Sequence, residues 1–291
     1  MSETVFVFGA GFSGRAIAKA ARAKGWRVFG TTRSRDRFAA LEAAGAEPLV
    51  FDGANMNAAV AAALAQATLL VASIAPDETG DPALNAVRDA MAGANMLKWI
   101  GYLSTVGVYG DKGGDWVDEA TAVNPSSARS RHRAQAEADW VELAARLGLP
   151  LAILRLSGIY GPGRNALDNV ANGDAKRVVK PGQVFNRIHV DDIAGAALFL
   201  AERRENGVFN VTDDLPAPPQ DVVEFAATLM GAAVPPAVAY DAAALSPMGR
   251  SFYAENKRVS NAKLKALGYR FIHPDFRDGL GAMWSGGDWR Q

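Results

Sequence analysis

The sequence predicts an α/β protein built on a doubly wound parallel sheet, with a smaller C-terminal α/β lobe. Over the first 155 residues, short apolar runs alternate with longer alanine-rich stretches. Strands separated by helix-length segments imply parallel β-α-β units with right-handed crossovers. After Leu156 this alternation stops, and a polar stretch opened by glycine and proline indicates a smaller lobe that follows the sheet.

The expected elements of the sheet follow one another in regular order. The predicted strands are Thr4–Phe8, Arg27–Thr31, Pro48–Phe51, Thr68–Ser73, Lys98–Ser104 and Leu151–Leu156. Several of them are almost uninterrupted apolar runs, which is typical of strands that helices cover on both faces. The predicted helices between them are Ser13–Lys24, Asp36–Ala44, Asn57–Gln66, Pro82–Ala92 and Ser130–Leu147.

The C-terminal part is less regular. Gly161 opens a polar segment that we expect to be a loop up to about Gln183. A helix at Asp191–Glu202, a strand at Val208–Val211 and a helix near Gln220–Met230 are expected beyond it. We therefore expect a larger domain of residues 1–160 plus 186–212, and a smaller lobe of residues 161–185 plus 213–291.

Composition and charge argue against several classes of protein. Of the 291 residues, 49% are hydrophobic and 21% are charged, as in an ordinary globular protein. The 31 Lys and Arg balance the 31 Asp and Glu, so no net charge favours nucleic acid or an anionic membrane. The absence of cysteine excludes disulfides and thiolate sites, and three histidines at no ligand spacing argue against a metal site. Because no leader or long apolar run stands out, we expect a soluble cytoplasmic protein.

A glycine-rich turn joins the first predicted strand to the first predicted helix. Residues 9–14 (GAGFSG) fit G-x-G-x-x-G in the strand-turn-helix context that a dinucleotide-binding (Rossmann) sheet requires. The first glycine permits the tight turn, the second lets the backbone approach a diphosphate, and the third allows close packing of helix on strand. The alternative is a tight turn that binds nothing. The expected cofactor contacts of this turn are Gly9, Gly11, Phe12, Ser13 and Gly14.

The end of the second strand indicates which cofactor is preferred. NAD-binding sheets usually carry an acidic residue there, but this strand ends Thr32-Arg33-Ser34. Arg33 can form charge-assisted hydrogen bonds to a 2′-phosphate, so NADP is preferred and NAD is the alternative. Arg33 and the nearby Arg35 can also be plain solvent-exposed loop residues. Asp52, after the third strand, is placed either to meet the adenine or to cap a helix, and Ser73, after the fourth, is a further expected contact.

Four further segments carry informative patterns. They are Leu103–Gly110 (LSTVGVYG), Arg155–Gly163 (RLSGIYGPG), Ile188–Ile193 (IHVDDI) and Glu255–Leu264 (ENKRVSNAKL). In this order they resemble the extended branch of the short-chain dehydrogenase/reductase superfamily, the NAD(P)-dependent epimerases and dehydratases. The resemblance implies that Thr105 takes the place of the family's catalytic Ser or Thr. It also implies that Leu156, Ser157 and Ile159 lie beside the nicotinamide.

The chain departs from that family at the catalytic pair. The family's Y-x-x-x-K signature ends four residues before a Glu, and counting back from Glu137 puts Arg133 at the Lys position and Arg129 at the Tyr position. Arginine keeps its proton in proteins, so Arg129 is no general acid or base, but it can stabilise negative charge. Arg133 can still supply the positive charge and the ribose contact of the Lys, and can pair with Glu137. Turned outward, the two arginines are instead a solvated helix face.

Other residues are weaker candidates. Tyr109 and Tyr160 follow strands and can donate a proton, although the family's tyrosines in these motifs are largely structural. His189 is expected to have a core or helix-capping role. The smaller lobe is expected to supply the substrate contacts, and position and chemistry single out Arg164, Asn165, Arg187 and Tyr253.

These observations favour an NADP(H)-dependent oxidoreductase of epimerase/dehydratase type that acts on an unidentified small hydroxylated or anionic substrate. The missing Tyr-Lys pair leaves open a non-catalytic NADP(H)-sensing regulatory protein, and a protein that binds nothing is a third alternative. The resemblance also implies a homodimer through the predicted helices Pro82–Ala92 and Ser130–Leu147. Neither nucleic acid nor a membrane is an expected partner.

Overall fold

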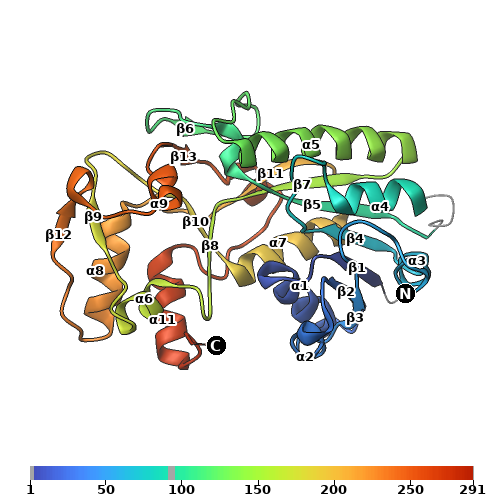
Figure 1. The fold of residues 1–291 in the computed structure, drawn as a ribbon, viewed down its shortest axis with the longest axis horizontal. Coiled ribbons are helices and arrows are strands. Elements are labelled where there is room, and N and C mark those ends of the chain that lie inside the picture. Colours follow the sequence, from blue (N-terminus) through green and yellow to red (C-terminus); the bar gives the residue numbers. More distant parts are fainter. Residues whose placement is uncertain (1–2, 91–95, 291) are drawn as a thin grey trace. The chain divides into compact units, whose positions relative to one another are not determined.

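The structure of the protein is a computed structural model that describes residues 3–90 and 96–290 (Figure 1). The chain forms two compact units. Unit 1 comprises Met1–Val108, Pro125–Arg155 and Ile193–Phe209, and unit 2 comprises Tyr109–Asn124, Leu156–Asp192 and Asn210–Gln291.

A seven-stranded sheet is the centre of the fold. Its strands stand in the order β11-β7-β5-β4-β1-β2-β3. The pairs β1–β2, β1–β4, β2–β3 and β4–β5 are all parallel. The bounds are β1 (Thr4–Phe8), β2 (Arg27–Thr32), β3 (Glu47–Val50), β4 (Leu69–Ala72), β5 (Trp99–Thr105), β7 (Leu151–Leu156) and β11 (Gly207–Val211). The order reverses between β1 and β4, so the predicted doubly wound sheet is confirmed.

Helices cover both faces of this sheet (Figure 1). They are α1 (Phe12–Ala23), α2 (Phe38–Ala43), α3 (Ala58–Leu64), α4 (Pro82–Ala90), α5 (Ala128–Leu147) and α7 (Val190–Arg203). Side chains of α3, α4 and α5, such as Leu64, Leu84 and Trp140, form one buried cluster with Phe6 and Ile100 of the strands. Burial of this apolar area is the main force that holds helices to sheet. Figure 1 shows α1 and α7 on the opposite side from α4 and α5.

The predicted strands and helices of the sheet occur where expected, with ends that differ by one or two residues. The last two residues of the predicted helix Pro82–Ala92 lie outside the described part of the chain. None of the helices in the described ranges has the length and apolar character needed to cross a bilayer.

Unit 2 contains more regular structure than the sequence predicts. Its strands pair as β8 (Gly158–Tyr160) with β10 (Arg187–His189), β9 (Arg177–Val179) with β12 (Ala237–Ala239), and β6 (Trp116–Val117) with β13 (Arg258–Val259). Its helices are α6 (Ala166–Ala171), α8 (Pro219–Leu229), α9 (Pro247–Phe252), α10 (Ala262–Ala266) and α11 (Phe276–Gly286). The expected loop from Gly161 to Gln183 is therefore wrong, because α6 and β9 lie within it. Both are held by a few buried apolar side chains, such as Leu167 and Val178.

The two units divide the chain differently from the expected domains. Residues 109–124, 156–160, 186–192 and 210–212, which were expected in the larger domain, belong to unit 2. The Tyr109 hydroxyl donates to Oδ1 of Asn210 at 2.8 Å, and Ile188 of β10 is the ladder partner of Ile159 of β8. These long-range contacts have no periodic signal in the sequence.

Candidate functional site

The carboxyl ends of five parallel strands bring the predicted cofactor positions of unit 1 to one edge of the sheet. Because β1 to β5 run in one direction, the residues that follow them lie at the same edge. In open α/β sheets, ligands bind at this edge where the strand order reverses. The residues there are Gly9 after β1, Arg33 after β2, Asp52 after β3, Ser73 after β4 and Thr105 at the end of β5.

The glycine turn between β1 and α1 has the geometry that its sequence requires. Gly9 has a φ of +78°, a conformation that glycine adopts without strain. A Cβ atom on Gly14 would lie 2.8 Å from the carbonyl oxygen of Gly9, so only glycine lets α1 approach β1 this closely. The Gly9 amide donates to Oγ1 of Thr31 at 2.8 Å, which ties the turn to β2.

Gly11 provides the open space that a diphosphate would need. It is exposed, and the nearest atom to a Cβ built on it is the Gly9 carbonyl oxygen, 4.0 Å away. Gly11 is also the N-cap of α1, where no side chain of the described residues accepts from the first-turn N–H groups. The N–H groups of Ser13 and Gly14 therefore keep the anion-binding capacity of a helix N-terminus. Glycine backbone and open space together fit a dinucleotide diphosphate.

Arg33 and Ser34 follow β2 as exposed residues, and Thr32 at the strand end is half-buried. Arg33 makes no ion pair with any residue in the described part of the chain. Asp36, the first acidic residue after β2, lies 3.9 Å from Arg37 instead. This edge thus presents a cation and hydroxyls, as the sequence predicts, and its preference for a cofactor stays a prediction.

Asp52 and Ser73 have local partners. Oδ1 of Asp52 accepts hydrogen bonds from the Ala54 and Asn55 amides at 2.8 and 3.2 Å. These bonds lower the pKa of the Asp52 carboxyl below its usual value. The carboxylate caps a turn, whereas Asn57 caps α3. The Ser73 amide donates to the Phe8 carbonyl, which leaves its half-buried hydroxyl near the end of β1.

Thr105 is half-buried at the end of β5. Its Oγ1 accepts a hydrogen bond from the Gly107 amide at 3.1 Å. Since the hydroxyl accepts from the backbone, its own proton stays available for donation to a ligand oxygen. The catalytic role that the family resemblance assigns to this position stays a prediction.

The two arginines of α5 have different surroundings. Arg129 is exposed and forms neither a hydrogen bond nor an ion pair within the described ranges. Arg133 is half-buried, and its Nη1 donates to the Leu103 carbonyl at 2.5 Å and to the Tyr102 hydroxyl at 3.2 Å. The guanidinium of Arg133 thus lies against β5, whereas that of Arg129 is open to solvent.

The predicted pairing of Glu137 with Arg133 is wrong. Glu137 is buried and instead binds Arg155 of β7, with Nη2 and Oε2 2.7 Å apart. Its Oε1 also accepts from the Ser104 hydroxyl at 2.5 Å. Sequence reasoning did not find this network, although Ser104 and Arg155 both lie in motifs that it identified. The sequence signal that could have revealed it is a Glu on a predicted helix and an Arg on the predicted strand that follows it, two elements that a parallel sheet brings together.

The two tyrosine candidates are buried and hydrogen-bonded within unit 2. Tyr109 is fully buried, and its hydroxyl donates to Oδ1 of Asn210, which gives it a structural contact; its catalytic role stays a prediction. Tyr160 packs against the His189 ring at 5.1 Å, and its hydroxyl donates to the Asp275 carbonyl at 3.4 Å. Burial raises the pKa of the Tyr160 hydroxyl well above its usual value, which makes it a poor proton donor.

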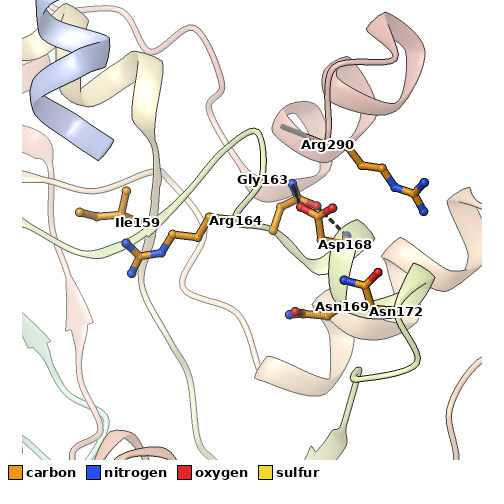
Figure 2. A pocket seen from close by; sticks show the side chains of 8 residues that line it. Ile159, Gly163, Arg164, Asp168, Asn169, Asn172 and Arg290 are labelled. Carbon is orange, nitrogen blue, oxygen red and sulfur yellow. Dashed lines mark hydrogen bonds between the residues drawn. The ribbon is translucent and has the colours of Figure 1, made fainter. Parts of the chain in front are cut away.

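An open cavity of about 820 Å³ in unit 2 brings three predicted residues together. Figure 2 shows Arg164 extending toward Ile159, while Arg290 lies on the other side of Gly163 and Asp168. Asn165 has a structural role there: its Oδ1 accepts from the Asp168 amide and its Nδ2 donates to the Gly161 and Trp289 carbonyls. Leu156 and Ser157, the other predicted nicotinamide neighbours, are buried at the end of β7 and just after it.

Arg187 and Tyr253 lie outside that cavity. Arg187 lines a second cavity, of about 200 Å³. Tyr253 belongs to an aromatic cluster with Phe185 and Tyr240, each with its ring centre 5.1 Å away. The four predicted substrate residues therefore do not form one site in unit 2.

Two histidines that are distant in sequence meet in unit 2. The rings of His189 and His273 lie 4.1 Å apart, and together with Asp191 they offer ligand atoms within 4.8 Å of one another. Nδ1 of His189 accepts from the Asp191 amide at 3.2 Å, so this histidine caps α7 as predicted. Burial, followed by the effect of His273, lowers the pKa of His189 to about 4. Sequence spacing could not reveal this pair.

The chain matches the model of the NAD dependent epimerase/dehydratase family over residues 5–212. A solved structure from Silicibacter pomeroyi DSS, described as that of a functionally unknown conserved protein, is 46% identical. It superposes with a TM-score of 0.88, over 99% of this chain and 100% of that one.

Two curated relatives are also similar. Protein YeeZ of Escherichia coli K12 is 30% identical over 220 residues, which is 72% of this chain and 77% of YeeZ. A 3-diazoavenalumate denitrifying reductase of Streptomyces sp is 32% identical over 161 residues, which is 50% of this chain and 51% of that relative. The match thus spans about half of the reductase. The family model covers most of the sheet and the glycine turn, and the chain belongs to the NAD dependent epimerase/dehydratase family.

Proposed function

We propose that the protein is an NADP(H)-dependent oxidoreductase that acts on a small hydroxylated or anionic substrate. The observation that carries the proposal is the glycine turn at the β1–β4 reversal, where Gly11 offers open space beside uncapped N–H groups. Arg33, exposed and without an ion-pair partner in the described ranges, supports the preference for NADP over NAD. A bound nicotinamide would supply the hydride chemistry.

The chain's own residues would bind and stabilise the reacting oxygen. The Thr105 hydroxyl, which accepts from Gly107, can donate its proton in a hydrogen bond to that oxygen. Arg129 can stabilise negative charge that develops there, because its guanidinium is exposed and unpaired in the described structure. Arg133 is held against β5 and contributes a fixed positive charge.

The Streptomyces relative supports oxidoreductase chemistry, since it is a reductase by name. A second candidate function is non-catalytic sensing of NADP(H). It is favoured by one observation: both residues at the family's Tyr and Lys positions are arginines, which cannot transfer a proton. A cytoplasmic location and a homodimer belong to the same proposal.

Cofactor oxidation distinguishes catalysis from sensing. NADPH consumption is followed with a panel of aldehydes, ketones and sugar nucleotides, for the wild-type protein, Arg129→Ala and the control Arg131→Ala. Arg131 is also exposed on α5, where its guanidinium donates to the Ser126 carbonyl. The proposal predicts turnover that falls at least about tenfold in Arg129→Ala and is retained in the control. Saturable NADPH binding without turnover on the whole panel contradicts catalysis and supports sensing.

A further inference from the structure

Arg187 is the charged side chain of the 200 Å³ cavity of unit 2. It lies on β10, and most of the other lining side chains are apolar ones from α6, α8 and α11. They are Tyr160, Ala166, Asn169, Pro219, Val222, Val223, Phe276 and Leu280. Burial of a cation in such surroundings costs free energy unless a partner compensates its charge.

The hydrogen bonds of Arg187 satisfy only part of its guanidinium. Nη1 donates to the carbonyl oxygens of Phe185 at 3.0 Å and Ala217 at 3.1 Å. The guanidinium also lies 5.8 Å from the ring centre of Phe276. No carboxylate in the described ranges is within ion-pair distance of it. A guanidinium has five N–H donors, and those on Nε and Nη2 of Arg187, which lines the cavity, have no hydrogen-bond acceptor within the described residues.

Asp213 is the acidic group whose charge acts most strongly on Arg187, but the two side chains form no ion pair within the described residues. Burial raises the pKa of the Asp213 carboxyl to about 8, and its Oδ2 has no hydrogen-bond partner within the described residues. Burial also lowers the pKa of Arg187, to about 10, so Arg187 stays charged at neutral pH. Asp213 is not among the residues that line the cavity, so Arg187 is the one charged side chain of its lining in the described part of the chain.

The size and lining of the cavity select among anions. An arginine fork binds carboxylates and phosphates alike. A phosphate dianion loses more hydration than a carboxylate on entering an apolar cavity, and only one cation is present to compensate it. The apolar lining from α8 and α11 favours a ligand with a hydrophobic body next to its charged group.

We propose that the cavity around Arg187 binds a small monocarboxylate with an apolar body, whose carboxylate pairs with the free side of the guanidinium. As a substrate site it rests on the function proposed above; as a binding site it depends on this cavity alone. Arg187 would then be the residue that selects acids over neutral analogues.

Calorimetric titration with benzoate, benzamide and phenyl phosphate tests the proposal on the full-length protein. Benzoate and benzamide have nearly the same shape but differ in charge. We expect benzoate to bind at least about tenfold more tightly than either of the other two compounds. Equal affinities for benzoate and benzamide, or tighter binding of phenyl phosphate, would overturn the proposal, as would the absence of heat with benzoate at millimolar concentration.

Three variants locate the site. Arg187→Met removes the charge at similar volume, and we expect it to weaken benzoate binding at least about tenfold. Ala166→Leu keeps the charge but fills the cavity, and should weaken benzoate binding to a similar degree. Arg270→Met, at an exposed arginine of the same unit, serves as the control. Unchanged benzoate binding in folded Arg187→Met contradicts the proposal. A parallel titration with NADPH reports separately on the glycine turn, so failure of one site is distinguished from failure of the other.

Discussion

The carboxylate of Glu137 on α5 forms a buried ion pair with Arg155 on β7, with 2.7 Å between Oε2 and Nη2. Only 8% and 7% of the two side chains are exposed, so neither charge is compensated by water. Ser104 of β5 donates a further hydrogen bond to the same carboxylate. The network therefore joins α5 to β5 and β7 and positions the carboxyl end of β5, where Thr105 lies.

Removal of the Glu137 charge should destabilise the protein strongly. Glu137→Gln removes the carboxylate that pairs with the buried Arg155 cation, and loss of one partner of a buried pair costs about 3 to 5 kcal/mol. Denaturant unfolding followed by circular dichroism measures the free energy of unfolding. Glu142→Gln, on the exposed side of the same helix, is the matched control and should change it by less than about 0.5 kcal/mol. Equal effects in the two variants contradict a structural role for the pair.

The stability of the protein should fall as pH rises because of Asp213. Burial raises the pKa of this carboxyl from 3.8 to about 8 in the folded protein. Between these values the folded state holds a proton that the unfolded chain has released, so its contribution to stability is lost as pH rises through about 8. The contribution is present below about pH 4. Through this group, the free energy of unfolding changes with pH by at most about 1.4 kcal/mol per pH unit.

Asp213→Asn, which mimics the protonated carboxyl, tests this dependence. The difference in the free energy of unfolding between pH 5 and pH 9 should shrink in Asp213→Asn and persist in Asp241→Asn, an exposed control. The charged groups that act on Asp213 are Arg187, Asp275 and Asp214, and all of them are unchanged in both variants. The same pH dependence in wild type and Asp213→Asn would show that this carboxyl titrates normally.

Arg33 should determine the preference for NADP. Its replacement by alanine removes a charge-assisted interaction with the 2′-phosphate, which is worth about tenfold or more in affinity. We expect Arg33→Ala to weaken NADPH binding by that factor and to leave NADH binding unchanged, as measured by fluorescence titration. Lys19→Ala, at an exposed position on α1, controls for the loss of one positive charge. A wild-type protein that binds NADH as tightly as NADPH contradicts the preference.

The sheet could be predicted from the sequence because its signals are local and repeated. Runs such as Thr4–Phe8 and Leu151–Leu156 are apolar along their whole length, and both occur as strands with the predicted ends. The glycine turn could be predicted as well, because Gly9 has a positive φ and the space at Gly14 admits no Cβ atom.

Unit 2 could not be predicted to the same degree, because its contacts are distant in sequence. The β6–β13 pair joins Trp116 to Arg258, and the rings of His189 and His273, which are 84 positions apart in the sequence, lie against each other. Short elements such as α6 depend on one cap, at Asn165, and one buried leucine, Leu167. Helix spacing suggests only partners on the same helix, such as Arg133 for Glu137. The true partner, Arg155, lies on β7, and helix spacing cannot indicate it.

Gly11 offers the most direct test of the central claim, which is that the turn after β1 binds a dinucleotide diphosphate. Apart from the adjacent residues and the backbone of α1, the described residues place no atom closer than 4.0 Å to an alanine Cβ at this position, so Gly11→Ala should shift the melting temperature by no more than about 3 °C. The same methyl group would occupy the space of the diphosphate. Calorimetric titration of both proteins with NADPH, NADP, NADH and NAD should show saturable binding to the wild type that weakens at least about tenfold in Gly11→Ala. No heat with any of the four compounds, or equal affinities in the two proteins, would contradict the account.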